Sequence, residues 1–152
     1  MKKIVFVLAL LIGLASYSQN GNDVSVERVI KTFYDGFNER DSVKIKLALH
    51  RNVKYQKLED VFWIKAVKEN DISEVIKSIM AIPKTTKFKL EASDVSIHAD
   101  EYIANAWVKT KFYLYDSYYQ CGSTSFQLVK EDDDWKIFSI LDHYSKENCK
   151  EQ

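Results

Sequence analysis

Two neighbouring residues near the end of the chain, Asp142 and His143, could carry acid–base chemistry. An imidazole titrates near neutral pH and can act as a general base, and an aspartate in an apolar pocket can do the same or hold a polar atom of a ligand. Each also has a plainer interpretation, as a histidine at the rim of a sheet and a solvated carboxylate near a turn. Because successive side chains of a strand point to opposite faces, only one of the two can face the interior.

A second group of candidates is aromatic. Rings that line a cavity and turn hydroxyl groups inward would suit a flat, partly polar ligand. Ordinary packing explains many aromatic residues equally well, and the strongest pocket candidates are Tyr55, Trp63 and Tyr113. The full set of candidate ligand-binding residues is Tyr34, Tyr55, Trp63, Trp107 and Tyr113.

The spacing of histidines and acidic residues predicts neither a metal site nor a cofactor. His50, His98 and His143 are far apart and form no HxH or HExxH motif. His50 is expected at the C-terminal end of a helix, where it would contact the last carbonyl groups. The acidic run Glu131 to Asp134 lacks the alternation of a calcium-binding loop, so it predicts a solvated hairpin loop.

The first 18 residues have the layout of a secretory signal peptide. Lys2 and Lys3 precede the apolar run Ile4 to Leu14, and the segment ends on Ser16-Tyr17-Ser18. The apolar run is too short for an ordinary membrane-spanning helix. We therefore expect cleavage near Ser18 and export to the periplasm or out of the cell, with an N-terminal anchor as the alternative.

The charge of the remaining chain argues against two classes of partner. Loss of Lys2 and Lys3 changes the balance from 22 basic and 22 acidic residues to 20 and 22, a net charge of −2. Such a chain has no electrostatic footprint for nucleic acid or an anionic membrane surface, and we expect neither partner after signal cleavage. Cys121 and Cys149 both lie in this part, and an oxidising compartment would permit a disulfide between them, which the sequence leaves open.

The elements that must position these residues begin with helices. Apolar residues at Val26, Val29, Ile30, Phe33 and Phe37 form one stripe of a helix over residues 25–40, in which Gly36 allows close packing. Asp41 is expected to cap a short helix over 42–50 with Val43, Leu47 and Ala48 as candidates for its inward face. Asp71 caps a third over 72–80, and residues 52–58 and 61–64 form a hairpin with its turn at Glu59-Asp60.

The last third of the chain predicts long antiparallel strands over residues 88–98, 102–115, 119–130 and 135–144. Pairing Lys130 with Trp135 puts one set of side chains on a single face and Asp142 on the other. That set is Trp135, Ile137, Ser139, Leu141 and His143, with Phe126 and Leu128 of the preceding strand. A slip of one residue would reverse the assignment. The order α-α-β-β-α-β-β-β-β predicts one α+β domain over residues 19–152.

This order resembles the cystatin-like cone of the nuclear transport factor 2 (NTF2-like) and SnoaL-like superfamily. Within it, the chain is most similar to exported bacterial proteins labelled "putative lumazine-binding". The matching pieces are FYDGFNERDS, ALHRNVKYQ, IANAWVKTKFYL and CGSTSFQLVKEDDDWKIFSILD. The resemblance implies a curved, mainly antiparallel sheet with about three helices on its concave face and a pocket inside, and dimerisation through the convex face.

Two functions follow from this fold as expectations, because it hosts both enzymes and binding modules. The preferred one is an exported binding or accessory protein that holds a small, partly aromatic ligand. The alternative is a cofactor-independent isomerase, dehydratase or hydrolase, with Asp142 or His143 as base and Tyr55 or Tyr113 polarising a carbonyl. Since no acid–base pair is evident, the sequence leaves enzyme activity undecided and leans against it.

Overall fold

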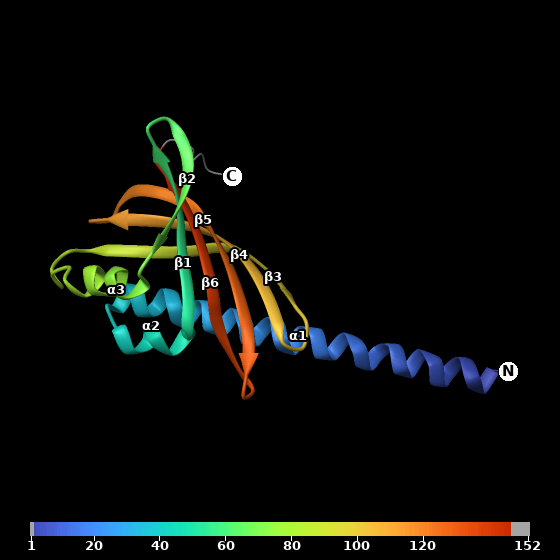
Figure 1. The fold of residues 1–152 in the computed structure, drawn as a ribbon. Helices are drawn as coiled ribbons and strands as arrows, with labels where there is room; N and C mark the ends of the chain where they lie inside the picture. Colours follow the sequence, from blue (N-terminus) through green and yellow to red (C-terminus); the bar gives the residue numbers. More distant parts are fainter. Residues whose placement is uncertain (1, 147–152) are drawn as a thin grey trace.

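The computed structural model describes the backbone of residues 2–146 and the side chains of residues 21–146. The side chains of the predicted signal peptide, residues 1–18, lie outside the described residues, and so does Cys149, whose disulfide with Cys121 the sequence leaves open. Figure 1 shows the chain order of the elements. They are α1 (Lys2–Glu39), α2 (Ser42–Ala48), β1 (Leu49–Val61), β2 (Ile64–Asn70), α3 (Ile72–Met80), β3 (Phe88–Ala99), β4 (Ile103–Leu114), β5 (Ser117–Glu131) and β6 (Asp134–Ser145).

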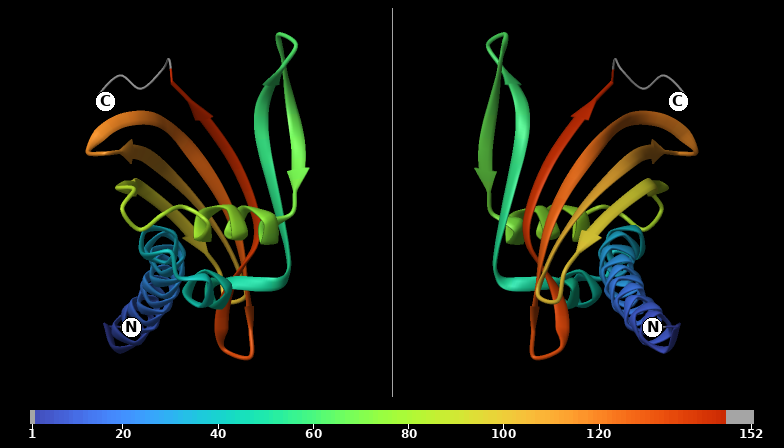
Figure 2. Two further views of the ribbon diagram at one scale, coloured as in Figure 1. Left: turned by 90° about the vertical axis from the view of Figure 1, so that its left-hand side faces the viewer. Right: turned by 90° about the vertical axis from the view of Figure 1, so that its right-hand side faces the viewer.

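The strands form one curved sheet, in the order β2-β1-β6-β5-β4-β3. All neighbouring strands are antiparallel except β1 and β6, which run parallel. Strands of 12 to 15 residues twist and coil, and the sheet curls around the helices (Figures 1 and 2). The α+β cone with three helices on the concave face, predicted from the sequence, is therefore confirmed for the described residues.

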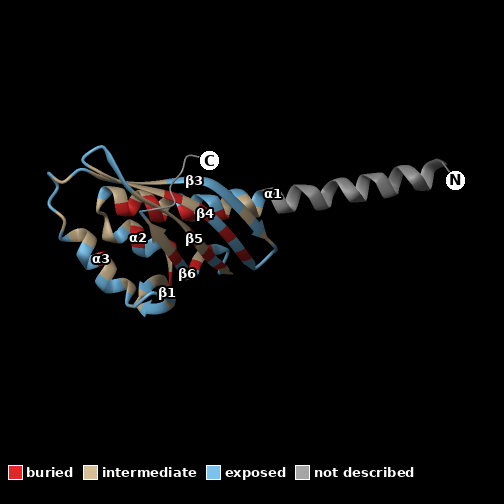
Figure 3. Ribbon diagram, turned by 90° about the horizontal axis from the view of Figure 1, so that it is seen from above, coloured by how far each residue is buried: buried red, intermediate tan, exposed pale blue. Residues whose placement is uncertain are grey.

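The core lies between α1 and the inner face of the sheet (Figure 3). Val26, Ile30, Phe33 and Phe37 are buried, so the predicted helical stripe is confirmed. These side chains meet the inner faces of β4 to β6, where a ring of Phe33 lies 5.7 Å from that of Phe126. The inward residues of these strands are Ala104, Ala106, Val108, Phe126, Leu128, Trp135, Ile137 and Ile140.

Gly36 lets α2 pack directly against α1. A Cβ at Gly36 would lie 2.7 Å from Ile45 Cγ1 and 2.8 Å from the Ile45 nitrogen, closer than real Cβ contacts. Ile45 and Ala48 are the buried residues of α2, whereas Val43 and Leu47 are exposed. The predicted inward face is thus confirmed for Ala48 and wrong for Val43 and Leu47, because seven residues are too few for periodicity to fix a face and the contact at Gly36 decides it.

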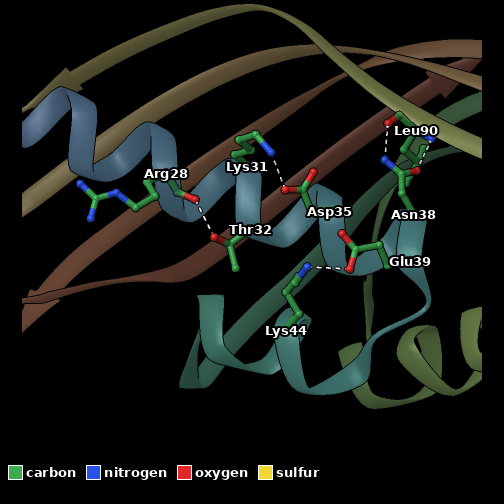
Figure 4. A network of polar contacts seen from close by, with 8 residues as sticks. All are labelled: Arg28, Lys31, Thr32, Asp35, Asn38, Glu39, Lys44 and Leu90. Carbon is green, nitrogen blue, oxygen red and sulfur yellow. Dashed lines mark hydrogen bonds and ion pairs between the residues drawn. The ribbon is translucent and has the colours of Figure 1, made fainter.

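The outer face of α1 is polar, and its last turn is fastened to the sheet (Figure 4). Asn38 donates from Nδ2 to the carbonyl of Leu90 at 2.9 Å and accepts from the Leu90 nitrogen at 2.7 Å. The side chain therefore occupies the free edge of β3 as a further strand would. Other pairs in this view are Lys31–Asp35, Lys44–Glu39 and Thr32 with the Arg28 carbonyl.

Two further expectations are corrected by the first hairpin. His50 lies in β1, not at a helix end; its ring is buried, with Nε2 3.3 Å from Glu131 and Nδ1 accepting from the Asn52 nitrogen. The turn between β1 and β2 is Phe62-Trp63, since Val61 pairs with Ile64. Glu59 and Asp60, predicted to form the turn, belong to β1, because strand pairing continues past these polar residues.

A β-bulge in β6 changes which of its side chains face inward. Lys130 pairs with Trp135 and Leu128 with Ile137, as predicted. Gln127 then pairs with Ser139, which leaves Phe138 as an extra residue and shifts the later pairs by one. Because a bulge adds one residue to a strand, each later side chain points to the opposite face of the sheet from the one expected without it. As a result Ile140 and Asp142 face inward, and the predicted grouping of Ser139, Leu141 and His143 on one face with Trp135 and Ile137 is wrong.

Candidate functional site

A small cavity lies inside the cone, where α1 and α3 meet the sheet. Its volume is about 40 Å³. Helices α1 and α3 supply one side, and β1, β3, β5 and β6 supply the other. The lining residues are Phe33, Tyr34, Phe37, Tyr55, Val75, Leu90, Thr124, Asp142 and Tyr144.

Asp142 supplies the only carboxylate among the residues that line this cavity, and it is 8 % exposed. The hydroxyl of Tyr55 donates to its Oδ2 at 2.9 Å. Within the described residues, Oδ1 is buried and has no hydrogen-bond partner. Thr124, which faces Asp142 across β5 and β6, also has a buried hydroxyl without a partner. A buried polar atom without a partner is costly, and Oδ1 can accept a further hydrogen bond, from the Thr124 hydroxyl beside it or from a bound molecule.

The electrostatics of the cavity favour neutral groups. Burial raises the pKa of Asp142, against the side chains of Thr124 and Tyr55 and the nearby charge of Lys57, which lower it. Burial also raises the pKa of Tyr55, Tyr34 and Tyr144, and the charge of Asp142 adds to each increase. The tyrosines therefore keep their hydroxyl protons at neutral pH. Tyr34 uses its hydroxyl in a 2.7 Å hydrogen bond with Thr110, next to the cavity.

This arrangement can do two things chemically. The free Oδ1 can accept a hydrogen bond from an N–H or O–H group, while the surrounding rings contact an apolar body. A carboxyl group with a raised pKa can also exchange a proton with a bound molecule, beside a tyrosine that donates a hydrogen bond. In the part of the chain that the structure describes, no three His, Cys, Asp or Glu side chains gather as a metal site requires.

Of the residues proposed from the sequence, Asp142, Tyr34 and Tyr55 come together at this cavity. His143 does not, because it points to the other face of β6, with Nδ1 3.3 Å from the Leu58 carbonyl oxygen. Trp107 is 52 % exposed and alternates along β4 with the buried Ala106 and Val108, so it lies on the outer face.

Trp63 and Tyr113 are also outside the cone cavity. Trp63 is fully exposed at the β1–β2 turn. Tyr113 lines a separate surface cleft of about 570 Å³, whose basic residues include Arg40, Lys84, Lys87 and Lys89. In that cleft Lys87 pairs with Asp116 at 3.0 Å and Lys89 with Glu91 at 2.6 Å. Placing Trp63, Trp107 and Tyr113 in the cone pocket is therefore wrong.

Two polar residues of the site, Thr124 and Tyr144, are missing from the sequence-based candidates. Tyr144 follows Asp142 by two residues, so it shares the same face of β6. Thr124 is the cross-strand neighbour of Asp142. Both would follow from the strand alternation once the bulge at Phe138 is known, but the sequence shows no signal for that bulge.

Comparison with known proteins gives likeness in structure only. No family model matches the chain, and no curated protein matches it in sequence. It is similar to a protein of unknown function with a cystatin-like fold from Nostoc punctiforme, with a TM-score of 0.64, 11% identity, and 82% of this chain and 92% of that chain covered. It is also similar to an NTF2-like protein from Pseudomonas putida, with a TM-score of 0.65, 13% identity, and 88% and 94% covered.

A third similar structure carries an enzyme name. It is a "Putative Scytalone Dehydratase" from Novosphingobium aromaticivorans, with a TM-score of 0.64, 12% identity, and 82% of this chain and 84% of that chain covered. Identities this low show a shared architecture and not a shared activity. On the geometry above and these comparisons, the chain has the cystatin-like, NTF2-like fold.

Proposed function

We propose that this protein is an exported small-molecule-binding protein that holds its ligand in the cone, with Asp142 accepting a hydrogen bond from the ligand. One observation carries the proposal. The Oδ1 atom of Asp142 is buried without a partner, at the edge of a cavity with aromatic walls. A ligand with an N–H or O–H group on a flat, mainly apolar body would satisfy that atom and contact the rings of Phe33, Phe37 and Tyr144.

The present size of the cavity requires the ligand to displace part of the wall. A volume of about 40 Å³ holds little more than one water molecule. Val75 of α3 forms part of the wall, and Ile76 is the only fully buried residue of that helix. Because so little of α3 is buried, it is the wall element that can move at least cost. We expect a ligand to enlarge the cavity by shifting α3 away from the sheet.

The sequence pieces shared with proteins labelled "putative lumazine-binding" suggest the first ligands to try. Pterins and flavins are flat and carry N–H donors, which is the chemistry that Oδ1 of Asp142 lacks. Small aromatic carbonyl compounds with a hydroxyl group form the second class. Export of the protein itself and a homodimer through the convex face of the sheet belong to the same proposal.

The proposal is tested by native mass spectrometry of the protein recovered after export, followed by a thermal-shift screen with these compounds. At a ligand concentration about 100 times Kd, binding adds about 2.7 kcal/mol to the free energy of unfolding. In a domain of this size, that corresponds to a rise in Tm of roughly 8 °C. Asp142→Leu, which has no acceptor oxygen, should remove most of that rise. The control Trp107→Phe, on the outer face, should keep it. Equal ligand-induced shifts in the wild type and in Asp142→Leu would contradict the proposal.

An enzymatic function is the second candidate, and the raised pKa of Asp142 beside the Tyr55 hydroxyl favours it. In an isomerase or dehydratase, Asp142 would move a proton while Tyr55 stabilises charge on a carbonyl oxygen. The resemblance to a structure named for scytalone dehydration makes hydroxylated aromatic ketones suitable substrates to try. Turnover that is lost in both Asp142→Asn and Tyr55→Phe, with binding retained in Tyr55→Phe, would distinguish an enzyme from a binding protein.

A further inference from the structure

The β1–β2 hairpin ends in two exposed aromatic residues. It stands away from the body of the molecule (Figures 1 and 2). Val61 pairs with Ile64, so the turn consists of Phe62 and Trp63 alone. Phe62 is 92 % exposed and Trp63 is 101 % exposed, and Ile64 beside them is exposed too. These two rings therefore contribute no packing to the fold.

The backbone of this turn is unfavourable for the residues that occupy it. Phe62 has φ of 46° and Trp63 has φ of 74°, both in the left-handed region. A two-residue turn with two positive φ angles favours Asn-Gly or Asp-Gly, and bulky residues avoid it. In the other two such turns among the described residues, Tyr115-Asp116 and Asp132-Asp133, at most one position is bulky, whereas both are bulky in Phe62-Trp63. Strain that brings no packing in the fold indicates a contact outside it.

The shape of the tip selects the kind of contact. A stable protein interface needs about 800 Å² from each partner, whereas two rings on a narrow turn supply roughly 150–250 Å² each. A lipid bilayer has no such minimum, because its interface accepts single aromatic side chains. Just behind the tip, Lys65 pairs with Asp60 at 2.7 Å, so the charges next to the rings cancel. The turn residues of the tip are thus apolar, and the ion pair next to them has no net charge.

We propose that the β1–β2 hairpin inserts Phe62 and Trp63 into the interface of a lipid bilayer. Tryptophan and phenylalanine favour the boundary between headgroups and acyl chains, and the Asp60–Lys65 pair would lie at the level of the headgroups. The net charge of the chain predicts no electrostatic attraction to a membrane, and this contact needs none. Within the described residues no helix is long and apolar enough to cross a membrane.

One double variant distinguishes membrane binding by the two rings from their effect on the stability of the turn. Phe62→Asn with Trp63→Gly installs the pair that this turn geometry favours. We expect the variant to have an equal or higher Tm, and its binding to phosphatidylcholine vesicles at millimolar lipid to fall on the order of tenfold or more. Wild type and variant are compared in the same form of the chain, as recovered after export. Trp107→Phe, which removes the other exposed tryptophan, should float with vesicles as the wild type does.

Tryptophan emission reports on the tip itself. In the Trp107→Phe background the remaining tryptophans are the buried Trp135 and the exposed Trp63. Insertion of Trp63 should shift the emission to shorter wavelength and allow quenching by brominated lipid. Binding and the shift should persist at high salt, because the charges behind the tip are paired.

Three results would overturn the proposal. The first is the absence of both flotation and the emission shift at millimolar lipid. The second is a lower Tm in the Asn-Gly variant, which would show that the two rings support the fold. The third is self-association of the wild type without lipid that the Asn-Gly variant loses, because the tip would then bind a second copy of the chain.

Discussion

The cone around Asp142 and the hairpin tip at Phe62-Trp63 depart from ordinary protein structure in opposite ways. The cone buries a carboxylate oxygen without a partner among aromatic rings. The tip exposes two aromatic rings on a backbone that disfavours them. Both features destabilise the fold, because neither the Oδ1 atom of Asp142 nor the two exposed rings make a stabilising contact within it. The two features therefore indicate different partners: a small ligand with a hydrogen-bond donor inside the cone, and an apolar environment around the hairpin tip.

The largest expected effect on stability is the difference between truncating a buried phenylalanine and truncating an exposed one. Phe126 is fully buried beneath α1, whereas Phe62 lies at the tip. Phe126→Ala should lower the free energy of unfolding by about 3–5 kcal/mol, because it leaves a cavity in the core. Phe62→Ala should change it by no more than about 0.5 kcal/mol. Denaturant unfolding monitored by circular dichroism measures both. A cost for Phe62→Ala comparable to that for Phe126→Ala would mean that the tip packs against the fold.

A smaller loss is expected at Gly122, which lies beside the strand end that carries Asp142. A Cβ there would run into the His143 carbonyl oxygen and lie 2.8 Å from Tyr144 Cδ1. Because backbone must shift, Gly122→Ala should cost about 1–3 kcal/mol and weaken ligand binding as Asp142 moves. The matched control is Gly21→Ala, since a Cβ at Gly21 meets nothing within 4 Å. Thermal unfolding of the two variants makes the comparison, and an unchanged Tm in Gly122→Ala would show that β6 adapts freely.

Asp142 should make stability depend on pH. Burial raises the pKa of Asp142 in the folded state above its unfolded value of about 3.9. The folded protein then holds the proton more tightly, so stability falls as pH rises from the unfolded pKa through the folded pKa. Asp142→Asn removes this loss. It should be more stable than the wild type at neutral pH, and the advantage should disappear as pH falls below about 4.

Parallel unfolding curves across this pH range measure the effect. The control is Trp107→Phe on the outer face, which changes no titratable group. An advantage of Asp142→Asn that grows toward low pH would mean that the carboxylate is stabilised in the folded state. In that case burial of the Asp142 carboxyl group would not destabilise the fold at neutral pH, and the comparison with the hairpin tip would fail on that point.

The smallest expected effect compares two turns. Trp63 and Asp133 both have positive φ, at 74° and 66°. Trp63→Gly should stabilise the fold by about 1 kcal/mol, because glycine adopts this conformation without a Cβ penalty. Asp133→Gly should gain less, since aspartate tolerates the left-handed region. Chemical denaturation of both single variants tests the order. A larger gain at Asp133 would show that the aromatic residue is not strained.

The sequence alone determined the architecture of this protein. The apolar stripe of residues 26–37, the caps at Asp41 and Asp71, and the alternating residues of the last four strands predict helices and strands that the structure contains. Periodicity and caps act over a few residues, so they can be read directly from the chain. The candidates Tyr34, Tyr55 and Asp142 also came from the sequence, although it ranked Trp63 and Tyr113 above Tyr34 as pocket residues.

The tertiary structure decided which residues meet. A single extra residue, Phe138, turns β6 over, so that Asp142 faces the cone and His143 faces away. Strand pairing across β1 and β2 moves the turn from Glu59-Asp60 to Phe62-Trp63 and puts two aromatic rings in solvent. Both outcomes depend on the register between strands, and a shift of one residue exchanges the inner and outer faces. The energies that set the register come from contacts between distant segments, which local sequence patterns do not record.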